Sequence, residues 1–365
     1  MSTSSNRYIV EPFLHYSDHA VYNPITNLSL TDSEPLFAAL RDFSLTLKTQ
    51  ESQSAAQVAD LATPGWIIPE TAPVSSRYRL KSVQIELHTL CNHSCAFCPV
   101  SIARRSKYVM PVGLFESILN QLQEFRETLQ GVWLHNYNEP TLDPRLPSMV
   151  KLVWERGLRP CINSNASGLS ESTVSALQNA GGLQSLSINL STLDPQRYAE
   201  QRGVNQLNQV RANLERLKSV QLAPRMNIVV IGNGDDQEEK DFNQISEFFK
   251  GSLFTVNHYP HNNRAGALPT GRCGDASEEL LGGCDFLGSR PLQHLTIDAY
   301  GGVVLCCQDY YSKYGAGNVA IEQLTSILSG VKMQQLRSQV YGLLPAPRDF
   351  ICRSCPFVLR GTGAR

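Results

Sequence analysis

Short runs of apolar and β-branched residues alternate with longer helical patterns between Val83 and Pro260. The runs are VQIELHT, GVWLHNY, RPCINSN, LQSLSINLS, RMNIVVIG and SLFTVNHYP. Between them, apolar residues recur every three or four positions and predict amphipathic helices at Leu114–Leu129, Leu146–Arg156, Ser170–Ala180, Leu207–Val220 and Glu238–Phe249. This alternation predicts strand-helix units around a parallel sheet, either a partial βα barrel or an open doubly wound sheet.

The segments on either side of these units have a different texture. Residues 1–80 carry a few short apolar runs and no chemical motif, which predicts a small N-terminal domain. Residues 81–260 hold the strand-helix units. From 261 to 365 the stretch HNNRAGALPTGRCG is followed by short strand patterns, glycines and further cysteines, which predict a smaller α+β domain.

The composition is that of an ordinary soluble globule. Of the 365 residues 42% are hydrophobic and 18% charged, and the net charge is -1. No basic bias argues for a nucleic-acid surface. Since the chain has neither a long apolar run nor a signal-peptide pattern at its start, we expect a cytoplasmic protein with no membrane partner.

Ten cysteines in a reducing compartment favour metal binding over disulfides. Three of them, Cys91, Cys95 and Cys98, lie in CNHSCAFC directly after the first strand run, at the sheet edge where ligands gather. A closed zinc site needs four ligands, and His88 or His93 could complete one. A 4Fe-4S cluster normally takes four cysteines, so three would leave one iron open.

The spacing CxxxCxxC, with Phe97 before the last cysteine, resembles the radical S-adenosylmethionine (SAM) superfamily. The resemblance implies a partial (β/α)6 TIM-like barrel and a 4Fe-4S cluster on the three catalytic cysteines, whose open iron binds SAM. After the second strand, Tyr137-Asn138-Glu139-Pro140 stands where the family has Gly-Gly-Glu-Pro, a turn that accepts hydrogen bonds from the methionyl ammonium.

Three later strand ends are also similar to the family. Asn165 lies in Ser-Asn-Ala, where relatives have Thr-Asn-Gly, and Asn189 and Ser191 stand where relatives carry Ser and Asp that meet the SAM ribose and carboxylate. Ile231, in NIVVIG, lies in the segment whose backbone reads adenine in the family. Cys161, inside an apolar strand, is expected to be a core residue.

The later cysteines resemble the auxiliary-cluster domain called twitch or SPASM. The resemblance implies a second 4Fe-4S cluster on Cys284, Cys306, Cys352 and Cys355, and a single auxiliary cluster is expected because no cysteine follows. Cys307 is the alternative to Cys306, since neighbouring side chains on a strand point to opposite faces, and Cys273 is expected to be free. A late CxxC pair also describes a closed zinc site.

The resemblance implies reductive cleavage of SAM to a 5'-deoxyadenosyl radical, hydrogen abstraction from a substrate and net oxidation, with an external low-potential electron donor. Family substrates are ribosomally made peptides, which are crosslinked or epimerised, or small molecules such as aminoglycoside-type sugars. The segment VYNPITNLSLT resembles the winged-helix region that grips a leader peptide by β-addition. Asp309, Tyr310 and Arg264 are candidates for substrate contact. The alternative from another class is a non-catalytic zinc-binding or electron-transfer module.

Overall fold

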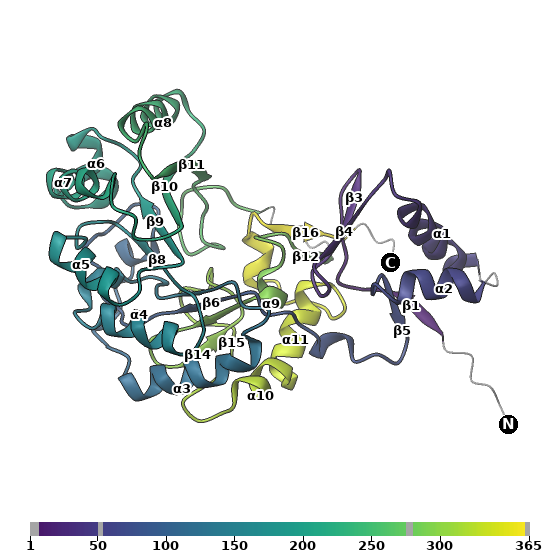
Figure 1. Cartoon of the computed structure of the whole chain (residues 1–365). Helices are drawn as coiled ribbons and strands as arrows, with labels where there is room; N and C mark the ends of the chain where they lie inside the picture. Colours follow the sequence, from purple (N-terminus) through teal and green to yellow (C-terminus); the bar gives the residue numbers. More distant parts are fainter. Residues whose placement is uncertain (1–6, 50–53, 275–279, 362–365) are drawn as a thin grey trace.

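The computed structural model describes residues 7–49, 54–274 and 280–361. Figure 1 shows the barrel on one side, the N-terminal domain on the other, and the C-terminal segment, coloured yellow, between them. Within these described ranges, none of the helices combines the length and apolar character needed to span a membrane.

A nine-stranded sheet forms the centre of the molecule, in the order β11-β10-β9-β8-β7-β6-β13-β14-β15. Six of its strands are parallel and adjacent in chain order: β6 (Ser82–Ile85), β7 (Gly131–Trp133), β8 (Pro160–Ser164), β9 (Ser185–Asn189), β10 (Arg225–Gly232) and β11 (Thr255–Pro260). A doubly wound sheet would reverse its strand order at a switch point, so the sequential order confirms the partial barrel.

Helices follow the barrel strands and lie on the outside of the sheet (Figure 1). They are α3 (Val112–Leu122), α4 (Leu146–Glu155), α5 (Glu171–Asn179), α6 (Pro195–Arg202), α7 (Leu207–Leu217) and α8 (Asp236–Phe248), with the short 3-10 turns η2 (Pro99–Ser101), η3 (Gln123–Phe125) and η4 (Pro140–Leu142). The five predicted helices are present. The first of them ends seven residues earlier than predicted, because its last turns tighten into η3 and a following turn.

The sequence pattern missed α6, which reads PQRYAEQR and buries only Tyr198 and Arg202. So few apolar positions give no helical stripe. Its local signals are nevertheless good, because Asp194 caps the helix by accepting the Arg197 N–H at 2.8 Å and Pro195 occupies the first turn.

The barrel core lies between the sheet and its helices. Leu186 and Ile188 of β9, Val132 of β7 and Ile228 of β10 are fully buried in one large apolar cluster. Strands of a parallel sheet are covered on both faces, which is why these runs read as nearly continuous apolar sequence.

The C-terminal domain continues the barrel sheet. Strand β13 (His294–Ile297) pairs in parallel with β6, and β14 (Gly302–Val304) and β15 (Gly315–Asn318) follow it in antiparallel order. The remaining elements are β12 (Leu281–Cys284), α9 (Arg290–Gln293), α10 (Leu324–Ser329), α11 (Val331–Val340), η5 (Ile351–Ser354) and β16 (Val358–Arg360), with β12 antiparallel to β16. This shared sheet fixes the later cysteines relative to the first barrel strand.

The N-terminal domain has two small sheets and two helices. Its elements are β1 (Tyr8–Val10), β2 (His15–Tyr16), β3 (Ala20–Asn23), β4 (Leu28–Thr31), α1 (Pro35–Thr49), α2 (Ala55–Ala62), β5 (Ile67–Pro69) and the 3-10 turn η1 (Val74–Ser76). The domain docks on the C-terminal domain through its β2 side, where the Phe13 and Tyr341 rings lie 4.6 Å apart and His15 Nε2 lies 2.8 Å from the Tyr341 hydroxyl.

Two glycines make a matched test of the barrel packing. A Cβ at Gly168 would lie 2.7 Å from the Thr141 Cβ, whereas a Cβ at Gly113, inside α3, would meet open space. We expect Gly168→Ala to destabilise the protein by about 1–3 kcal/mol. Gly113→Ala should instead stabilise it by up to about 1 kcal/mol, through helix propensity. Urea unfolding followed by circular dichroism compares the midpoints, and equal midpoints would contradict the packing described here.

Candidate active site

The three cysteines of CNHSCAFC lie in the loop after β6, and the end of α6 holds this loop in place. The backbone N–H of Ser94 donates to the Arg202 carbonyl and that of Ala96 to the Gln201 carbonyl, both at 2.9 Å. From the opposite side, the Arg104 guanidinium donates to the carbonyls of Cys91 and His93 at 3.1 and 3.2 Å. The loop is therefore set in position by the protein itself.

Arg202 is the most connected side chain at this loop, and it was not among the predicted site residues. It is 2% exposed, and it donates to the Cys95 sulfur at 3.8 Å and to the Asn189 carbonyl at 2.9 Å. It also bonds the Asn189 side-chain oxygen, and its guanidinium lies over the Phe97 ring at 4.9 Å. One cation thus joins a cysteine, the end of β9 and the aromatic residue of the motif.

The Glu139 carboxylate is buried at the turn after β7. Its Oε1 accepts hydrogen bonds from the Ser164 hydroxyl at 2.7 Å and the Thr141 hydroxyl at 2.6 Å, and its Oε2 accepts the Asn165 N–H at 2.7 Å. Burial raises the pKa of Glu139, and these donors act against that rise. Because Oε2 has a single donor here, it retains capacity to accept a further hydrogen bond.

Asn165 connects the third strand end to the cysteine loop. Its side-chain Nδ2 donates to Asn92 Oδ1 at 2.9 Å, and Asn92 Nδ2 in turn donates to the Ser167 hydroxyl at 2.9 Å. Asn92 lies between the first two cysteines of the motif. This side chain therefore orients the loop in addition to lining the strand end.

Tyr137 and Asn138 have different surroundings, although they are neighbours. The Tyr137 hydroxyl donates to the Cys307 carbonyl at 2.6 Å, and its N–H donates to Glu86 at 3.1 Å, so this side chain reaches toward the C-terminal domain. Asn138 Oδ1 accepts the Asn136 N–H at 2.9 Å, while its buried Nδ2 has no partner in the described residues. Of the two, Asn138 has the donor left for a ligand.

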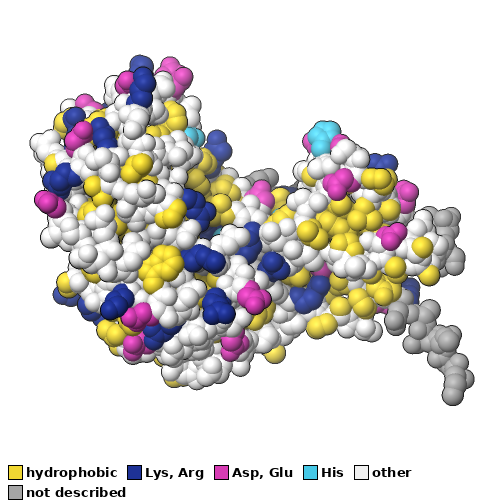
Figure 2. Space-filling view, viewed as in Figure 1, with side chains coloured by type: hydrophobic (Ala, Val, Ile, Leu, Met, Phe, Trp, Pro, Cys, Tyr) yellow, Lys and Arg dark blue, Asp and Glu magenta, His cyan; other side chains and the backbone are white. Residues whose placement is uncertain are grey.

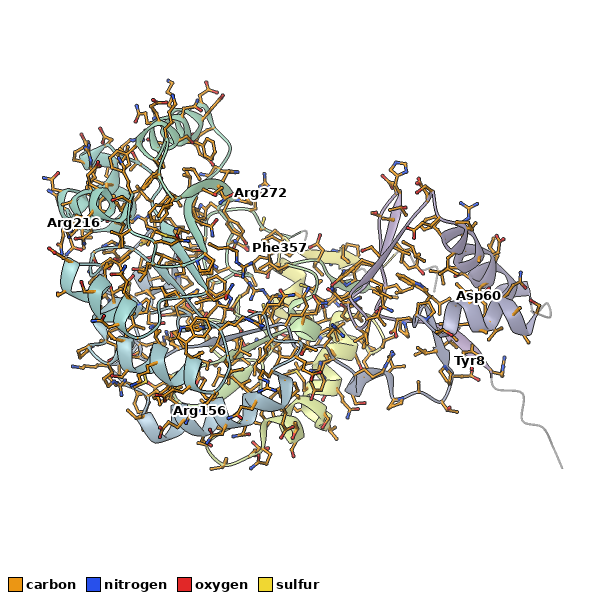
Figure 3. All side chains as sticks on the ribbon, viewed as in Figure 1. Tyr8, Asp60, Arg156, Arg216, Arg272 and Phe357 are labelled. Carbon is orange, nitrogen blue, oxygen red and sulfur yellow. The ribbon has the colours of Figure 1, made fainter. Side chains whose placement is uncertain are left out.

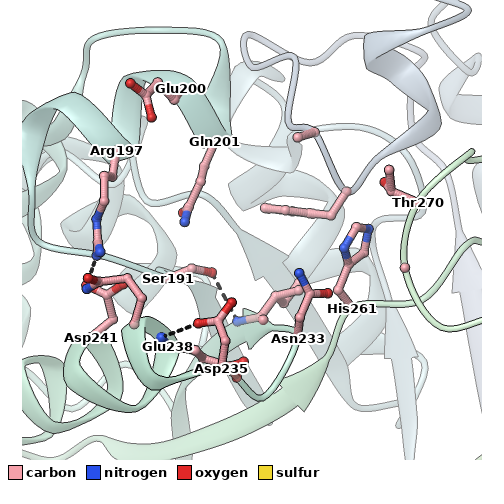
Figure 4. Close-up of a pocket in the computed structure, with 16 residues that line it drawn as sticks. Ser191, Arg197, Glu200, Gln201, Asn233, Asp235, Glu238, Asp241, His261 and Thr270 are labelled. Carbon is pink, nitrogen blue, oxygen red and sulfur yellow. Dashed lines mark hydrogen bonds and ion pairs between the residues drawn. The ribbon is translucent and has the colours of Figure 1, made fainter.

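The ends of β9 and β10 form one wall of a cavity of about 410 Å³ (Figure 4). Ser191 accepts the Ile231 N–H at 3.0 Å, which joins the two strand ends, and Phe97 lines the cavity beside them. In Figure 4, Gln201 and His261 face this space, and both carry a buried polar atom that lacks a partner in the described residues. The volume is in the range of small-molecule sites.

The motif thiols lie close to one another, with Cys95 buried and Cys91 and Cys98 half-buried. Burial raises the pKa of Cys91 to about 12; the His93 N–H acts against this rise, and the charges of Glu139, Cys95 and Cys98 add to it. Burial likewise raises the pKa of Cys98 to about 11. Iron ligation would supply the positive charge that such buried, mutually repelling thiolates require, so the donor set suits an iron-sulfur cluster.

The later cysteines also come together, around Cys284 at the end of β12. Cys306, Cys352 and Cys355 each lie within electrostatic range of Cys284. The neighbouring rings of Phe286 and Phe357 stack at 4.1 Å, and Phe357 marks this region between the barrel and the N-terminal domain in Figure 3.

Backbone N–H groups two positions later in the chain act against the burial that raises the pKa of four predicted ligand thiols: Cys91, Cys98, Cys284 and Cys355. A direct hydrogen bond of this kind reaches the Cys306 sulfur. Hydrogen bonds to sulfur are among the features that tune iron-sulfur clusters. At Cys306 the donor is Gln308 at 3.4 Å, which favours Cys306 over Cys307 as the ligand.

Two cysteines lie outside both groups, and the zinc alternative depends on whether suitable ligands surround one point. Cys161 is buried in the barrel and Cys273 is exposed. In the described part of the chain, no three His, Cys, Asp or Glu side chains are gathered around a point where a single ion would sit. His93 Nε2 lies 3.1 Å from Gln206 Oε1 and His88 Nδ1 accepts the Leu90 N–H at 3.1 Å, whereas the other ring nitrogen of each histidine is buried without a partner in the described residues.

The three candidates for substrate contact differ in their availability. The Asp309 carboxylate accepts the N–H groups of Lys313 and Tyr314 at 2.9 and 2.7 Å, which closes a turn. The Tyr310 hydroxyl bonds the Ala103 carbonyl, and its ring meets Tyr137 edge to face. Arg264 is the candidate without a hydrogen bond or ion pair from its guanidinium to any described residue.

Comparison with known families agrees with this division of the cysteines. Residues 85–248 match the radical SAM superfamily, and residues 284–356 match the SPASM iron-sulfur cluster-binding domain. The chain therefore contains a radical SAM domain and a C-terminal SPASM domain, which confirms the resemblance. The two domains imply 4Fe-4S clusters and SAM as cofactors.

Individual relatives are distant. A probable GTP 3',8-cyclase of Sulfolobus acidocaldarius is 28% identical over 152 residues, 41% of this chain and 47% of that protein. An S-adenosyl-L-methionine-dependent 2-deoxy-scyllo-inosamine dehydrogenase of Niallia circulans is 28% identical over 102 residues, 27% of this chain and 40% of that protein. The chain thus spans less than half of either relative. SuiB of Streptococcus suis, bound to its precursor peptide SuiA, shares the fold with a TM-score of 0.58 and 14% identity, over 91% of each chain.

Arg202 offers a test of the site geometry. Replacing a side chain that hydrogen-bonds a metal ligand typically costs 10- to 100-fold in metal affinity or activity. We therefore expect Arg202→Ala to weaken iron retention on the motif cysteines by about that factor, measured by chelator challenge of reconstituted protein. Arg211→Ala, an exposed arginine on α7, is the control and should retain iron like the wild type. Equal retention by both variants would contradict the role given to Arg202.

Proposed function

We propose that this chain reductively cleaves SAM to methionine and a 5'-deoxyadenosyl radical, and that the radical abstracts hydrogen from a ribosomally made peptide, leading to a crosslink or an epimerised residue. The proposed cleavage of SAM rests on one observation: the cysteine loop lies beside the cavity that Ser191 and Ile231 line. An external low-potential electron donor is required for cleavage.

Each residue of the site has a role in this proposal. Cys91, Cys95 and Cys98 hold the cluster, which supplies the electron when it is bound. Glu139 Oε2 and Asn138 Nδ2 have hydrogen-bonding capacity left for the amino acid part of SAM. Asn189, Ser191, Phe97 and Ile231 are assigned to the nucleoside side, with Gln201 and His261 as further polar contacts from the cavity wall. Asn165 positions the loop.

The N-terminal domain supports a peptide as the substrate. Its β2-β3-β4 sheet docks through the β2 side, so β4 is an edge strand with backbone groups available to a further strand. Exposed Leu28 on β4 and Leu45 on α1 lie in this domain, and Figure 2 shows hydrophobic side chains gathered between these two elements. Edge-strand addition beside an apolar surface is a common mode of peptide recognition.

Dehydrogenation of a small molecule is the second candidate. It is favoured by the match to the Niallia circulans dehydrogenase, which covers 102 residues of this chain. The two candidate functions differ in the substrate that must reach the cysteine groups, a peptide or a small molecule. A peptide would also need the N-terminal domain, whereas a sugar-sized substrate would not.

SAM cleavage is tested with anaerobically reconstituted, dithionite-reduced protein. The wild type should hold about eight irons per chain and form 5'-deoxyadenosine, detected by mass spectrometry. Cys91→Ala should hold about four irons and form none, because the auxiliary cluster remains. Cys273→Ala is the matched control, since this cysteine is exposed and lies outside both groups. A wild type that binds iron but never forms 5'-deoxyadenosine would refute the proposal.

Peptide recognition is tested at Ser29. The Thr31 N–H is directed away from β3, because it donates to Glu34 at 2.7 Å, and Ser29, two residues earlier, shares that orientation. Ser29→Pro should therefore spare the β3–β4 ladder but weaken binding of a precursor peptide encoded beside the gene by at least about tenfold, measured by fluorescence anisotropy. Ser29→Ala keeps the N–H and should bind normally. Unchanged binding by Ser29→Pro would exclude addition at β4.

A further inference from the structure

Arg290 is a buried cation beside the auxiliary cysteines. It is 8% exposed, its guanidinium lies over the Phe286 ring at 4.4 Å, and its NH1 donates to Gln84 Oε1 at 3.0 Å. Its backbone N–H and its charge both act to lower the pKa of the Cys284 thiol. Among the described residues no carboxylate forms an ion pair with it, and its buried Nε lacks an acceptor. A buried charge without a counterion is unfavourable.

Arg264 is a second cation without a carboxylate partner among the described residues; it is half-buried and held by a strained loop. Arg264 and Ala265 both have φ of 51°, in the left-handed region that non-glycine residues rarely occupy. The loop is fixed because the Arg264 N–H donates to Asn262 at 3.1 Å and the Ser354 hydroxyl donates to the Ala265 carbonyl at 3.3 Å. Ser354 lies between Cys352 and Cys355, so the strained loop is anchored to the CxxC pair.

The two arginines face different sets of thiols. Arg290 lies within electrostatic range of Cys284, Cys306 and Cys307, all in the auxiliary group. Arg264 lies within range of Cys307 and also of Cys98, the last cysteine of the SAM motif. Arg290 is therefore associated with one cysteine group, and Arg264 lies between the two.

We propose that Arg264 and Arg290 are the counterions of the auxiliary cluster and raise its reduction potential. Reduction adds negative charge to a cluster, and a nearby positive charge in a buried site stabilises that state. Arginine suits this role because it stays protonated at every physiological pH. The unfavourable burial of the two cations is then offset by the anionic cluster.

The proposal rests on the proposed function and deepens it. After hydrogen abstraction the substrate is a carbon radical, and its net oxidation requires loss of one more electron and one proton. A raised potential makes the auxiliary cluster a better acceptor for that electron, with the proton released to solvent. The external donor reduces the cluster beside SAM. The two arginines would thus favour electron transfer from the substrate radical to the auxiliary cluster.

The experiment is an electron paramagnetic resonance redox titration of reconstituted full-length protein without substrate. The auxiliary cluster is titrated in a background with Cys91, Cys95 and Cys98 changed to Ala, and the SAM-binding cluster in a background with Cys284, Cys352 and Cys355 changed to Ala. Arg290→Gln should lower the auxiliary potential and leave the other nearly unchanged. Arg264→Gln should lower both. Arg290→Lys should restore most of the wild-type value.

The control is Lys240→Gln, which removes an exposed charge on α8 and should move neither potential. If both Gln variants bind iron fully and titrate like the wild type, the proposal is overturned, and so it is if Lys240→Gln produces the same shift. Should Arg290→Gln lose iron, Arg264→Gln decides the question by itself, through its effect on both clusters. Failure of the wild type to cleave SAM would defeat the proposed function and leave these titrations unaffected.

Discussion

Two backbone hydrogen bonds, from Ser94 to the Arg202 carbonyl and from Ala96 to the Gln201 carbonyl, determine where the motif cysteines lie. The last carbonyls of a helix have no partner within the helix, and the loop N–H groups satisfy them at the end of α6. The first and fourth strands of the barrel are thereby joined at their carboxyl edge. Phe97, the Asn189 end of β9 and the cavity then follow from the same arrangement.

The second constraint is that the two cysteine groups belong to one continuous sheet. Strand β13 extends the barrel beside β6, and the Tyr137 hydroxyl bonds the Cys307 carbonyl across the boundary. Arg105 strengthens this junction, because it pairs with buried Glu86 and lies over the Tyr310 ring at 5.1 Å. A substrate held between the groups would therefore meet two sites of fixed separation.

Electrostatics connect these two constraints. Buried and half-buried thiols gather in two places, where burial raises the pKa of Cys91 and Cys352, and buried Arg290 and half-buried Arg264 lie at the same junction without a carboxylate partner among the described residues. The gathered thiols and the arginines are each unfavourable alone. Anionic clusters ligated by these thiols would make the two complementary. The left-handed backbone at Arg264 is consistent with this account, since strained residues concentrate at functional sites.

The order of strands and helices, the parallel sheet and both cysteine groups could be predicted from sequence, because apolar periodicity and motif spacing are local properties. Tertiary structure alone decided the rest. Arg202 meets Cys95 across 107 residues and Tyr137 meets Cys307 across 170, and no local pattern encodes such contacts. The contact of the Tyr137 hydroxyl with the C-terminal domain was therefore not predicted, and the expectation that this turn meets SAM stays a prediction. The polar helix α6 lacked an apolar stripe, although it supplies the contact that positions the motif, since its burial depends on partners from distant parts of the chain.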